Sequence, residues 1–345
     1  MNIGMRAAGQ DAPCYVIAEA GANHNRDLDI ARRLIDVAGE AGADAIKFQT
    51  YSGARLYSKR TPRFRYLDAI TDKLPSDLLE EISLPREWQP ILSDYAGQQG
   101  IDFFSTPFDH EAVAELDALD VPAMKIASFE IVDLQLIRAA AATGRALLIS
   151  TGMATMGEIE DAVRVAESAG GRDIGLMQCT SLYPAPASAA NLRAMATMRQ
   201  AFGRPVGLSD HTTGVAVPIA AAALGAAFIE KHVTLDRTMA GPDHPFALEP
   251  DELRMMVAGI REAQGALGNG RKEGPNPQEA EEMHRLGRRS LIVARDLPAG
   301  TVLGEEMLTV KRPGFGIPPK HLDIVVGRVL RADAQEDDIL TWDMV

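Results

Sequence analysis

Hydrophobic residues are concentrated in short segments that recur along the first two thirds of the chain. Each segment holds five to seven residues, mostly β-branched or small and apolar, without the polar–apolar alternation of a half-exposed strand. This pattern is typical of strands buried on both faces of a parallel sheet. The sequence predicts eight such strands, over residues 15–20, 44–48, 101–105, 123–127, 146–150, 174–178, 205–209 and 227–233.

Amphipathic stretches lie between these segments, for example over 29–43, 158–171 and 214–226, and predict helices. Several end in Ala-Gly sequences that suit helix C-termini. Strict alternation of strand and helix, eight times over, predicts an α/β fold of the (β/α)8 TIM barrel type, which takes about 250 residues. A doubly wound open sheet is the alternative, but no GxGxxG motif follows the first strand.

The pattern changes after a last barrel helix over 250–267, and the chain divides into three parts. Residues 1–267 form the barrel domain, residues 268–285 form a linker rich in Gly, Pro and charge, and residues 286–345 form a small β-rich domain. A domain of about sixty residues is marginally stable alone, so we expect it to pack on a larger body.

The longest gap between predicted strands lies between Phe48 and Gly100. It contains helical stretches over 61–70 and 72–82, so it holds more than a simple connection. We expect the region from Thr50 to Pro85 to form an enlarged loop on the catalytic face of the barrel.

Composition and charge exclude several kinds of protein. The net charge of -13 disfavours nucleic acid as a partner, because its phosphates require a basic surface. No apolar run reaches the roughly 18 residues that a membrane span needs, and residues 1–13 lack the features of a signal peptide. With only Cys14 and Cys179, disulfides are not expected, and we predict a cytoplasmic protein without membrane or nucleic-acid partners.

Polar side chains occur at the C-terminal end of every predicted strand, which is the functional end in a TIM barrel. In chain order they are Glu19; Lys47 and Gln49; Ser105 and Thr106; Lys125 and Ser128; Ser150 and Thr151; Thr180, Ser181 and Tyr183; Ser209, Asp210 and His211; and Glu230, Lys231 and His232.

Lysines and hydroxyls within this set predict a site for a phosphate or a phosphorylated carboxylate. An acidic protein binds such an anion when cations are placed locally. The predicted anion site comprises Lys47, Thr106, Lys125, Ser128, Ser150 and Ser209. The alternative is structural, because buried charges need partners: Lys47, Lys125 and Lys231 would then pair with Glu19 and Glu230 inside the barrel.

Two histidines, His211 and His232, follow neighbouring strands and predict a divalent metal site. With only two protein ligands, exchangeable positions remain, which suits Mn²⁺ or Mg²⁺ better than structural Zn²⁺. The alternative is that each histidine only hydrogen-bonds a carboxylate. The roles of His24 and His244 stay open. Cys179 is discounted as a nucleophile, because the sequence marks no adjacent base.

Motifs spread over nearly the whole chain resemble the sialic acid (N-acetylneuraminate) synthase family, which includes legionaminic and pseudaminic acid synthases. The C-terminal KRPGFGI (311–317) resembles that family's antifreeze-like, or SAF, domain. The barrel motifs are AEAGANHN (18–25), KFQTY (47–51), STPFD (105–109), KIAS (125–128), STGM (150–153), CTSLYPAP (179–186), GLSDHT (207–212), EKH (230–232) and GPDH (241–244).

The resemblance implies a transferase of surface polysaccharide biosynthesis. Phosphoenolpyruvate condenses with an N-acyl mannosamine-type aldose and water, giving a nine-carbon 2-keto-3-deoxy acid and phosphate by C–O cleavage. It assigns phosphoenolpyruvate binding to Lys47, Thr106, Lys125, Ser128, Ser150 and Ser209, and the metal to His211 and His232. It assigns sugar binding to Glu19, Gln49, Ser181, Tyr183 and Asp243, and catalysis to Glu19, Lys47 and Lys125.

The resemblance further implies a domain-swapped homodimer in which Arg312 reaches the sugar in the partner's barrel. The sequence departs from the family pattern at Ser181, where members that use N-acetylmannosamine usually have Asn. The segment 179–186 is more similar to members that make legionaminic or pseudaminic acid, so the amino sugar stays open. Two other functions are retained: a 3-deoxy-ulosonate phosphate synthase-like aldolase acting on another aldose, and a sugar-binding barrel without catalysis.

Overall fold

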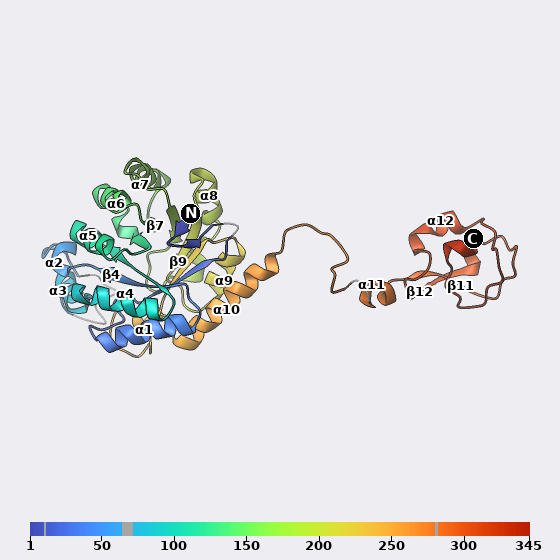
Figure 1. Cartoon of the computed structure of the whole chain (residues 1–345), viewed down its shortest axis with the longest axis horizontal. Helices are drawn as coiled ribbons and strands as arrows, with labels where there is room; N and C mark the ends of the chain where they lie inside the picture. Colours follow the sequence, from blue (N-terminus) through green and yellow to red (C-terminus); the bar gives the residue numbers. More distant parts are fainter. Residues whose placement is uncertain (10–11, 64–71, 280–281) are drawn as a thin grey trace. The chain divides into compact units, whose positions relative to one another are not determined.

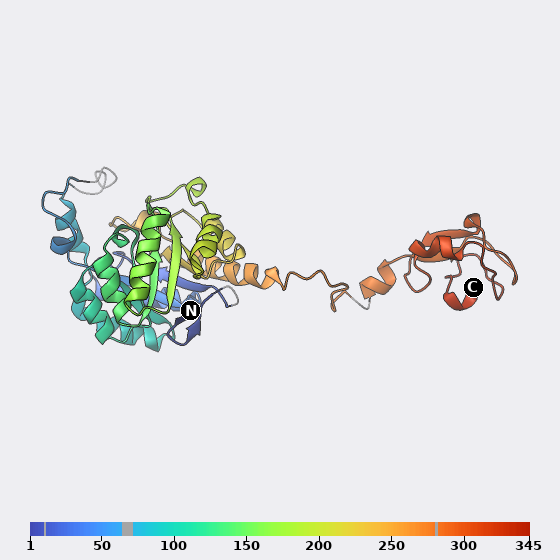
Figure 2. The same cartoon turned by 90° about the horizontal axis from the view of Figure 1, so that it is seen from above.

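The structure is a computed structural model that describes residues 1–9, 12–63, 72–279 and 282–345. The chain forms two compact units, residues 1–268 and 269–345, and each has its own hydrophobic core (Figures 1 and 2). The predicted helical stretch over 61–70 lies largely outside the described residues.

Eight parallel strands close into a barrel in the first unit, in the order β10-β3-β4-β5-β6-β7-β8-β9. The predicted TIM barrel is therefore confirmed, and the doubly wound alternative is wrong because a closed sheet has no edge strands. The strands are β3 (Tyr15–Glu19), β4 (Ala45–Thr50), β5 (Asp102–Pro107), β6 (Ala123–Ile126), β7 (Ala146–Ser150), β8 (Ile174–Cys179), β9 (Val206–Asp210) and β10 (Phe228–His232).

Helices surround this barrel and cover the outer faces of its strands (Figure 1). Those predicted from the apolar periodicity correspond to α1, α7, α9 and α10. The helices of this unit are α1 (Leu28–Glu40), α2 (Gly53–Leu56), α3 (Pro75–Ile82), α4 (Gln89–Gln98), α5 (His110–Ala118), α6 (Leu134–Ala142), α7 (Met156–Ser168), α8 (Ala194–Phe202), α9 (Ala216–Ala223) and α10 (Pro250–Leu267).

The barrel interior is apolar toward the N-terminal ends of the strands and polar toward their C-terminal ends. Phe228 and Glu230 lie two positions apart on β10, so both side chains point inward at different heights. Two glycines make room for Phe228: Gly175 on β8 faces its ring, and Gly207 on the adjacent β9 faces its backbone. A Cβ on Gly175 would lie 2.7 Å from the ring, and one on Gly207 would lie 2.3 Å from the Phe228 carbonyl oxygen. This close packing supports the layer of ionisable side chains above it.

A short hairpin precedes the barrel and was not predicted from the sequence. It consists of β1 (Asn2–Ile3) and β2 (Arg6–Ala7), and Ile3 is fully buried in the core of this unit. The Asn2 amide donates to the carboxylate of Asp173, which directly precedes β8. The hairpin therefore lies at the N-terminal ends of the strands, opposite the expected functional face. Its four strand residues are too few to show a periodic pattern.

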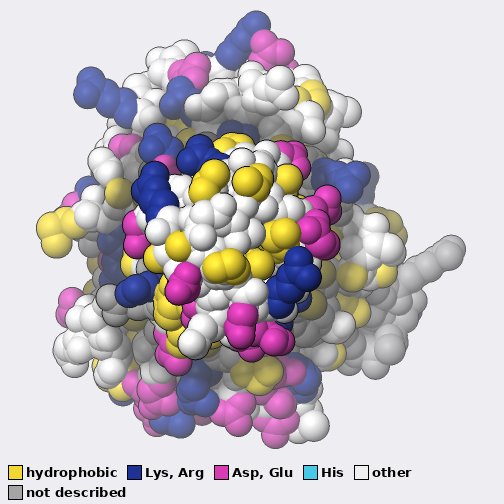
Figure 3. Space-filling model, turned by 90° about the vertical axis from the view of Figure 1, so that its right-hand side faces the viewer, with side chains coloured by type: hydrophobic (Ala, Val, Ile, Leu, Met, Phe, Trp, Pro, Cys, Tyr) yellow, Lys and Arg dark blue, Asp and Glu magenta, His cyan; other side chains and the backbone are white. Residues whose placement is uncertain are grey.

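The second unit is small and β-rich, as predicted for an SAF domain. Strands β11 (Ser290–Val293) and β12 (Leu308–Lys311) pair antiparallel, and short helices α11 (Glu282–Gly287) and α12 (Leu322–Val325) flank them in the sequence. Several hydrophobic side chains are exposed, including Phe315 and Trp342. Figure 3 shows hydrophobic side chains among charged ones on one face of this unit.

No helix in the described residues has both the length and the apolar character needed to cross a lipid bilayer.

Candidate active site

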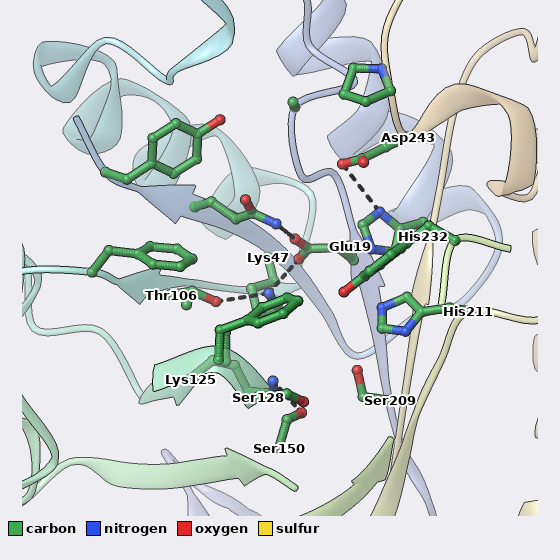
Figure 4. Close-up of a pocket in the computed structure, with 18 of the residues that line it drawn as sticks. Glu19, Lys47, Thr106, Lys125, Ser128, Ser150, Ser209, His211, His232 and Asp243 are labelled. Atoms are coloured by element: carbon green, nitrogen blue, oxygen red, sulfur yellow. Dashed lines mark hydrogen bonds and ion pairs between the residues drawn. The ribbon is translucent and has the colours of Figure 1, made fainter. Parts of the chain in front are cut away.

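A pocket opens where the barrel strands end at their C-termini, and it gathers most of the predicted site residues (Figure 4). Two predicted residues do not line it. Ser181 lies beside Gly152 at the end of β7, and Arg312 belongs to the second unit. The predicted residues that line the pocket are Glu19, Lys47, Gln49, Thr106, Lys125, Ser128, Ser150, Tyr183, Ser209, His211, His232 and Asp243.

Strand register explains why these side chains meet. Glu19 on β3 lies opposite Lys47 on β4, and Gln49 lies opposite Thr106 on β5. On β10, which pairs with β3, Glu230 lies opposite Ser209 of β9. Alternate residues of a strand point to the same face, so each of these residues enters the interior from a different strand at a similar height.

Lys47 is at the centre of the charged network. Its Nζ lies 2.7 Å from Glu19 Oε2 and 3.7 Å from Glu230 Oε1, and it donates to Thr106 Oγ1 at 2.9 Å. Gln49 donates to the other oxygen of Glu19 at 2.8 Å. The pairing of Lys47 with Glu19 and Glu230 expected for a structural role is present. It occurs inside the pocket, where the same charges face any ligand.

Lys125 is less well neutralised than Lys47. Its Nζ donates to Ser150 Oγ at 2.6 Å, while its nearest carboxylate oxygen, Glu230 Oε2, is 3.9 Å away. Burial lowers the pKa of Lys125 below its usual value, because Glu230 compensates only in part. Next to it, Ser128 Oγ accepts the backbone N–H of Gly152 at 3.0 Å. This end of the pocket presents a cation and hydroxyls that suit an added anion.

Glu19 is a buried carboxyl group with an altered affinity for protons. Burial raises its pKa to about 7; Lys47 opposes this rise and the nearby Glu230 adds to it. Glu19 is therefore partly protonated at neutral pH, as a group that gives and takes a proton should be.

The two predicted metal ligands are adjacent, with ring centroids 5.4 Å apart. His211 Nδ1 lies 3.1 Å from the Thr180 carbonyl oxygen, a contact that fixes the ring. His232 Nδ1 is buried without a hydrogen bond, although Asp243 Oδ2 lies 3.7 Å away. Burial, followed by the charge of His211, lowers the pKa of His232 well below its usual value, so its imidazole is neutral.

These features fit a divalent cation, since a neutral imidazole with an unsatisfied nitrogen is a metal ligand and a backbone contact orients the second ring. No group of three or more His, Cys, Asp or Glu among the described residues is arranged to hold a metal ion. A cation at His211 and His232 would therefore take its remaining ligands from water or substrate.

The other two histidines near these loops have structural contacts. His24 Nδ1 accepts the backbone N–H of Arg26 at 3.0 Å, and burial lowers its pKa to about 4. His244 lies between Thr234 Oγ1 at 2.7 Å and Asn25 Oδ1 at 3.2 Å, which joins two loops of the catalytic face. Neither histidine lines the pocket.

Two expectations about individual residues are corrected. Lys231 does not pair with a glutamate: it points away from the pocket and its Nζ lies 2.6 Å from Asp210 Oδ2. Cys179 does have a base beside it, since its Sγ lies 3.7 Å from His211 Nδ1. These residues lie 32 positions apart, so only the closing of the barrel brings them together.

Several pocket residues were not assigned to the site from the sequence. From the sequence, Glu230 was noted only as a polar residue at a strand end. In the structure it contacts Ser209 and lies within 4 Å of Lys47 and Lys125. Tyr51 lines the pocket directly after the KFQT segment. An apolar wall, defined as Leu56, Leu78, Leu79 and Ile82, also lines it. Its residues give no chemical signal, because leucines on a helix ordinarily indicate packing.

The fold and the pocket define an α/β barrel with an ionisable site at the C-terminal ends of its strands, followed by an SAF domain. Residues 34–272 match the NeuB family, and residues 288–345 match the SAF domain. The chain belongs to the NeuB family.

Relatives support this membership over the full length of the chain. The N,N'-diacetyllegionaminic acid synthase of Legionella pneumophila is 37% identical, with 99% of this chain and 97% of the relative covered. The pseudaminic acid synthase of Helicobacter pylori is 38% identical, covering 92% and 93%. The solved structure of N-acetylneuraminic acid synthetase from Leptospira borgpetersenii, in complex with citrate, matches with a TM-score of 0.74 and 35% identity, covering 82% and 94%.

The raised pKa of Glu19 predicts a specific pH dependence of stability. Between its usual pKa and about 7, the folded protein holds a proton that the unfolded chain has released. Unfolding therefore releases this proton, and the free energy of unfolding falls as pH rises through this window. Above pH 7 this contribution is constant.

Replacing Glu19 with Gln should remove that fall. Between pH 5.5 and 8, wild type should lose about 2 kcal/mol of stability relative to Glu19→Gln, at about 1.4 kcal/mol per pKa unit. Urea unfolding followed by circular dichroism, with a chelator present, measures the difference. Parallel curves for the two proteins across this range would contradict the assignment.

Proposed function

We propose that this protein is a nonulosonic acid synthase that condenses phosphoenolpyruvate with an N-acylated mannosamine-type sugar and water, releasing phosphate by C–O cleavage. The observation that carries the proposal is the pair of buried lysines, Lys47 and Lys125, set among hydroxyls at the C-terminal end of the barrel. The names of the NeuB relatives, which include legionaminic and pseudaminic acid synthases, support the same reaction class.

The phosphate and carboxylate of phosphoenolpyruvate would occupy the end of the pocket around Lys125. Lys125 lacks a close carboxylate partner, so an incoming anion supplies the neutralisation that Glu230 gives only in part. The remaining donors to this anion are Lys47, Thr106, Ser128, Ser150 and Ser209, all of which line the pocket.

The sugar would occupy the opposite end of the pocket, near Glu19. Gln49, Tyr183 and Asp243 line this region and offer hydrogen bonds to hydroxyl and acylamino groups. Asp243 is half-buried beside His232, and burial raises its pKa. Ser181, outside the lining, would act on the sugar only through Gly152 or a water molecule.

The reaction joins C3 of phosphoenolpyruvate to the aldehyde carbon of the open-chain sugar. Glu19, with a pKa about 7, transfers a proton to the aldehyde oxygen, which becomes a hydroxyl. Water adds at C2, and the bond between C2 and the bridging oxygen breaks, so that this oxygen leaves with the phosphate. The water oxygen becomes the keto oxygen. Lys47 and Lys125 stabilise the departing phosphate, which takes up one proton of this water, and the other proton of the water returns to Glu19.

A divalent cation, Mn²⁺ or Mg²⁺, would be held by His211 and His232 together with water or sugar oxygens. When bound, it supplies Lewis-acid polarisation of the aldehyde.

The active form would be a cytoplasmic, domain-swapped homodimer in which Arg312 completes the sugar site of the partner subunit. The exposed hydrophobic side chains of the second unit support a role for it in assembly, because a domain of this size has a small core of its own.

Isotope labelling tests the reaction directly. Phosphoenolpyruvate carrying ¹⁸O in the bridging C–O–P position is incubated with the enzyme, Mn²⁺ and a panel of unphosphorylated N-acyl hexosamines. The label should leave with phosphate, and mass spectrometry should detect a nine-carbon acid. Turnover only with a phosphorylated aldose would favour the ulosonate phosphate synthase-like alternative. Sugar binding without phosphate release would favour the non-catalytic barrel.

Substitution of a proposed metal ligand should abolish turnover without unfolding the barrel. His232→Ala should lower kcat by ~100-fold or more and weaken Mn²⁺ binding measured by electron paramagnetic resonance. His110→Ala, at the exposed start of α5, is the matched control and should behave as wild type. Wild-type activity that survives complete chelation would show that the metal assignment is wrong.

Subunit complementation tests the role of Arg312. Arg312→Ala should raise KM for the sugar while leaving KM for phosphoenolpyruvate unchanged, because the residue would contact only the sugar. At a sugar concentration well below the raised KM, co-expression of Arg312→Ala with Lys125→Ala should give higher activity than either variant alone, since a mixed dimer contains one intact barrel served by one intact Arg312. Absence of restoration in isolated mixed dimers would place Arg312 in its own subunit's site or outside the site.

A further inference from the structure

One buried ion pair lies outside the pocket and takes no part in the proposed chemistry. Lys231 Nζ is 2.6 Å from Asp210 Oδ2, and the two side chains are only 1% and 2% exposed. On β10, Lys231 lies between Glu230 and His232, which both line the pocket. Because successive residues of a strand point to opposite faces, the pair lies on the outer face of the barrel, behind the site.

The pair closes a turn around His211, which follows Asp210 at the end of β9. The Asp210 carboxylate accepts the Thr212 N–H at 3.0 Å through Oδ1 and the Thr212 hydroxyl at 3.0 Å through Oδ2. Lys231 Nζ donates to the Thr212 carbonyl oxygen as well as to Asp210. Residues 210–212 therefore form a closed turn, named here the histidine turn, and Lys231 joins it to β10.

Two further contacts fix His211 within the histidine turn. Its carbonyl oxygen accepts the N–H of Ala185 at 2.9 Å, and its Nδ1 lies 3.1 Å from the Thr180 carbonyl oxygen. On β10, His232 directly follows Lys231. Lys231 thus connects the backbone that carries one histidine to the backbone that carries the other, and Figure 4 shows both rings in the pocket, with centroids 5.4 Å apart.

Stability alone gives no reason for a charged pair at this place. Desolvating the two charges costs several kcal/mol, and an apolar pair of similar volume is often as stable or more so. An apolar pair, however, would donate nothing to the Thr212 carbonyl oxygen and would accept nothing from the Thr212 N–H and hydroxyl. The charges supply a fixed geometry, because charge-assisted hydrogen bonds are short and strong.

We propose that Lys231 and Asp210 are positioning residues, which hold His211 and His232 at the separation needed to bind one divalent cation. This inference rests on the proposed function and deepens its metal site. Neither residue of the pair lines the pocket, so the pair acts through the backbone of the two histidines. Residues that orient metal ligands contribute roughly 10- to 100-fold to metal affinity.

Replacing the pair with apolar residues tests this role. The double variant Asp210→Leu/Lys231→Met removes both charges, so neither is left buried without a partner. Its Kd for Mn²⁺, measured by electron paramagnetic resonance on the full chain after removal of metal, should rise by roughly 10- to 100-fold. The Mn²⁺ concentration that gives half-maximal phosphate release should rise by the same factor, and excess Mn²⁺ should restore activity.

A second buried polar pair on neighbouring strands is the matched control. Thr50 Oγ1 on β4 and Ser105 Oγ on β5 lie 2.8 Å apart, and neither residue lines the pocket. The double variant Thr50→Val/Ser105→Ala breaks this bond, leaves the histidine turn intact and should bind Mn²⁺ as wild type does. A loss of Mn²⁺ affinity in this control as large as in Asp210→Leu/Lys231→Met would show a general loosening of the barrel and overturn the inference.

Thr212→Val tests the histidine turn without changing a charge. Valine keeps the shape of threonine and removes the hydroxyl whose hydrogen bond Asp210 accepts. The Kd of this variant for Mn²⁺ should also rise. Should the double variant at Asp210 and Lys231 fail to fold, Thr212→Val decides, and an unchanged Kd for Mn²⁺ would then overturn the inference.

Three results separate this inference from the proposed function. An unchanged Kd for Mn²⁺ in Asp210→Leu/Lys231→Met, with the circular dichroism spectrum of wild type, would overturn the positioning role and leave the proposed function standing. Absence of Mn²⁺ binding by wild type would overturn the metal site of the proposed function, and this inference with it. Mn²⁺ binding that depends on the pair, without phosphate release with any sugar, would overturn the proposed reaction and support the positioning role.

Discussion

The buried ion pair between Lys47 and Glu19 is the interaction on which the site depends. Its two atoms lie 2.7 Å apart inside a closed barrel, where an unpaired charge costs several kcal/mol. The pair exists because β3 and β4 are in a register that places these residues opposite each other. A shift of β4 by one residue against β3 would turn Lys47 out of the interior and leave Glu19 without its partner, so the site depends on the register of the barrel.

This constraint explains how much the sequence predicted. The strands were predictable because each is buried on both faces and therefore continuously apolar, and the polar residues that break this pattern mark the functional end. Contacts between distant segments were not predictable. The Cys179–His211 contact arises only when β8 and β9 pair, and Glu230 enters the site only because β10 lies next to β9. The N-terminal hairpin is too short to show any period.

The apolar wall escaped prediction for a different reason. Leucine and isoleucine on α3 fit the ordinary pattern of an amphipathic helix packed on a core, and the sequence does not tell whether that core is protein or ligand. The enlarged connection after β4 was expected on the catalytic face, and α2 and α3 do lie in it. The length of this connection indicated a functional role, whereas the identity of its residues did not.

The two sides of the pocket come from different parts of the fold. Residues on the strands supply the charges, and their positions are fixed by hydrogen bonding around a closed barrel. Residues of α2 and α3 contact the same space from a connection that the barrel does not need for closure. A substitution in the wall can therefore leave the Lys47 network in place, whereas a change in the strands alters the network itself. The charged network and the apolar wall thus depend on different elements of the fold: the register of β3 and β4 fixes the first, and the close contact between α2 and α3 at Gly53 fixes the second.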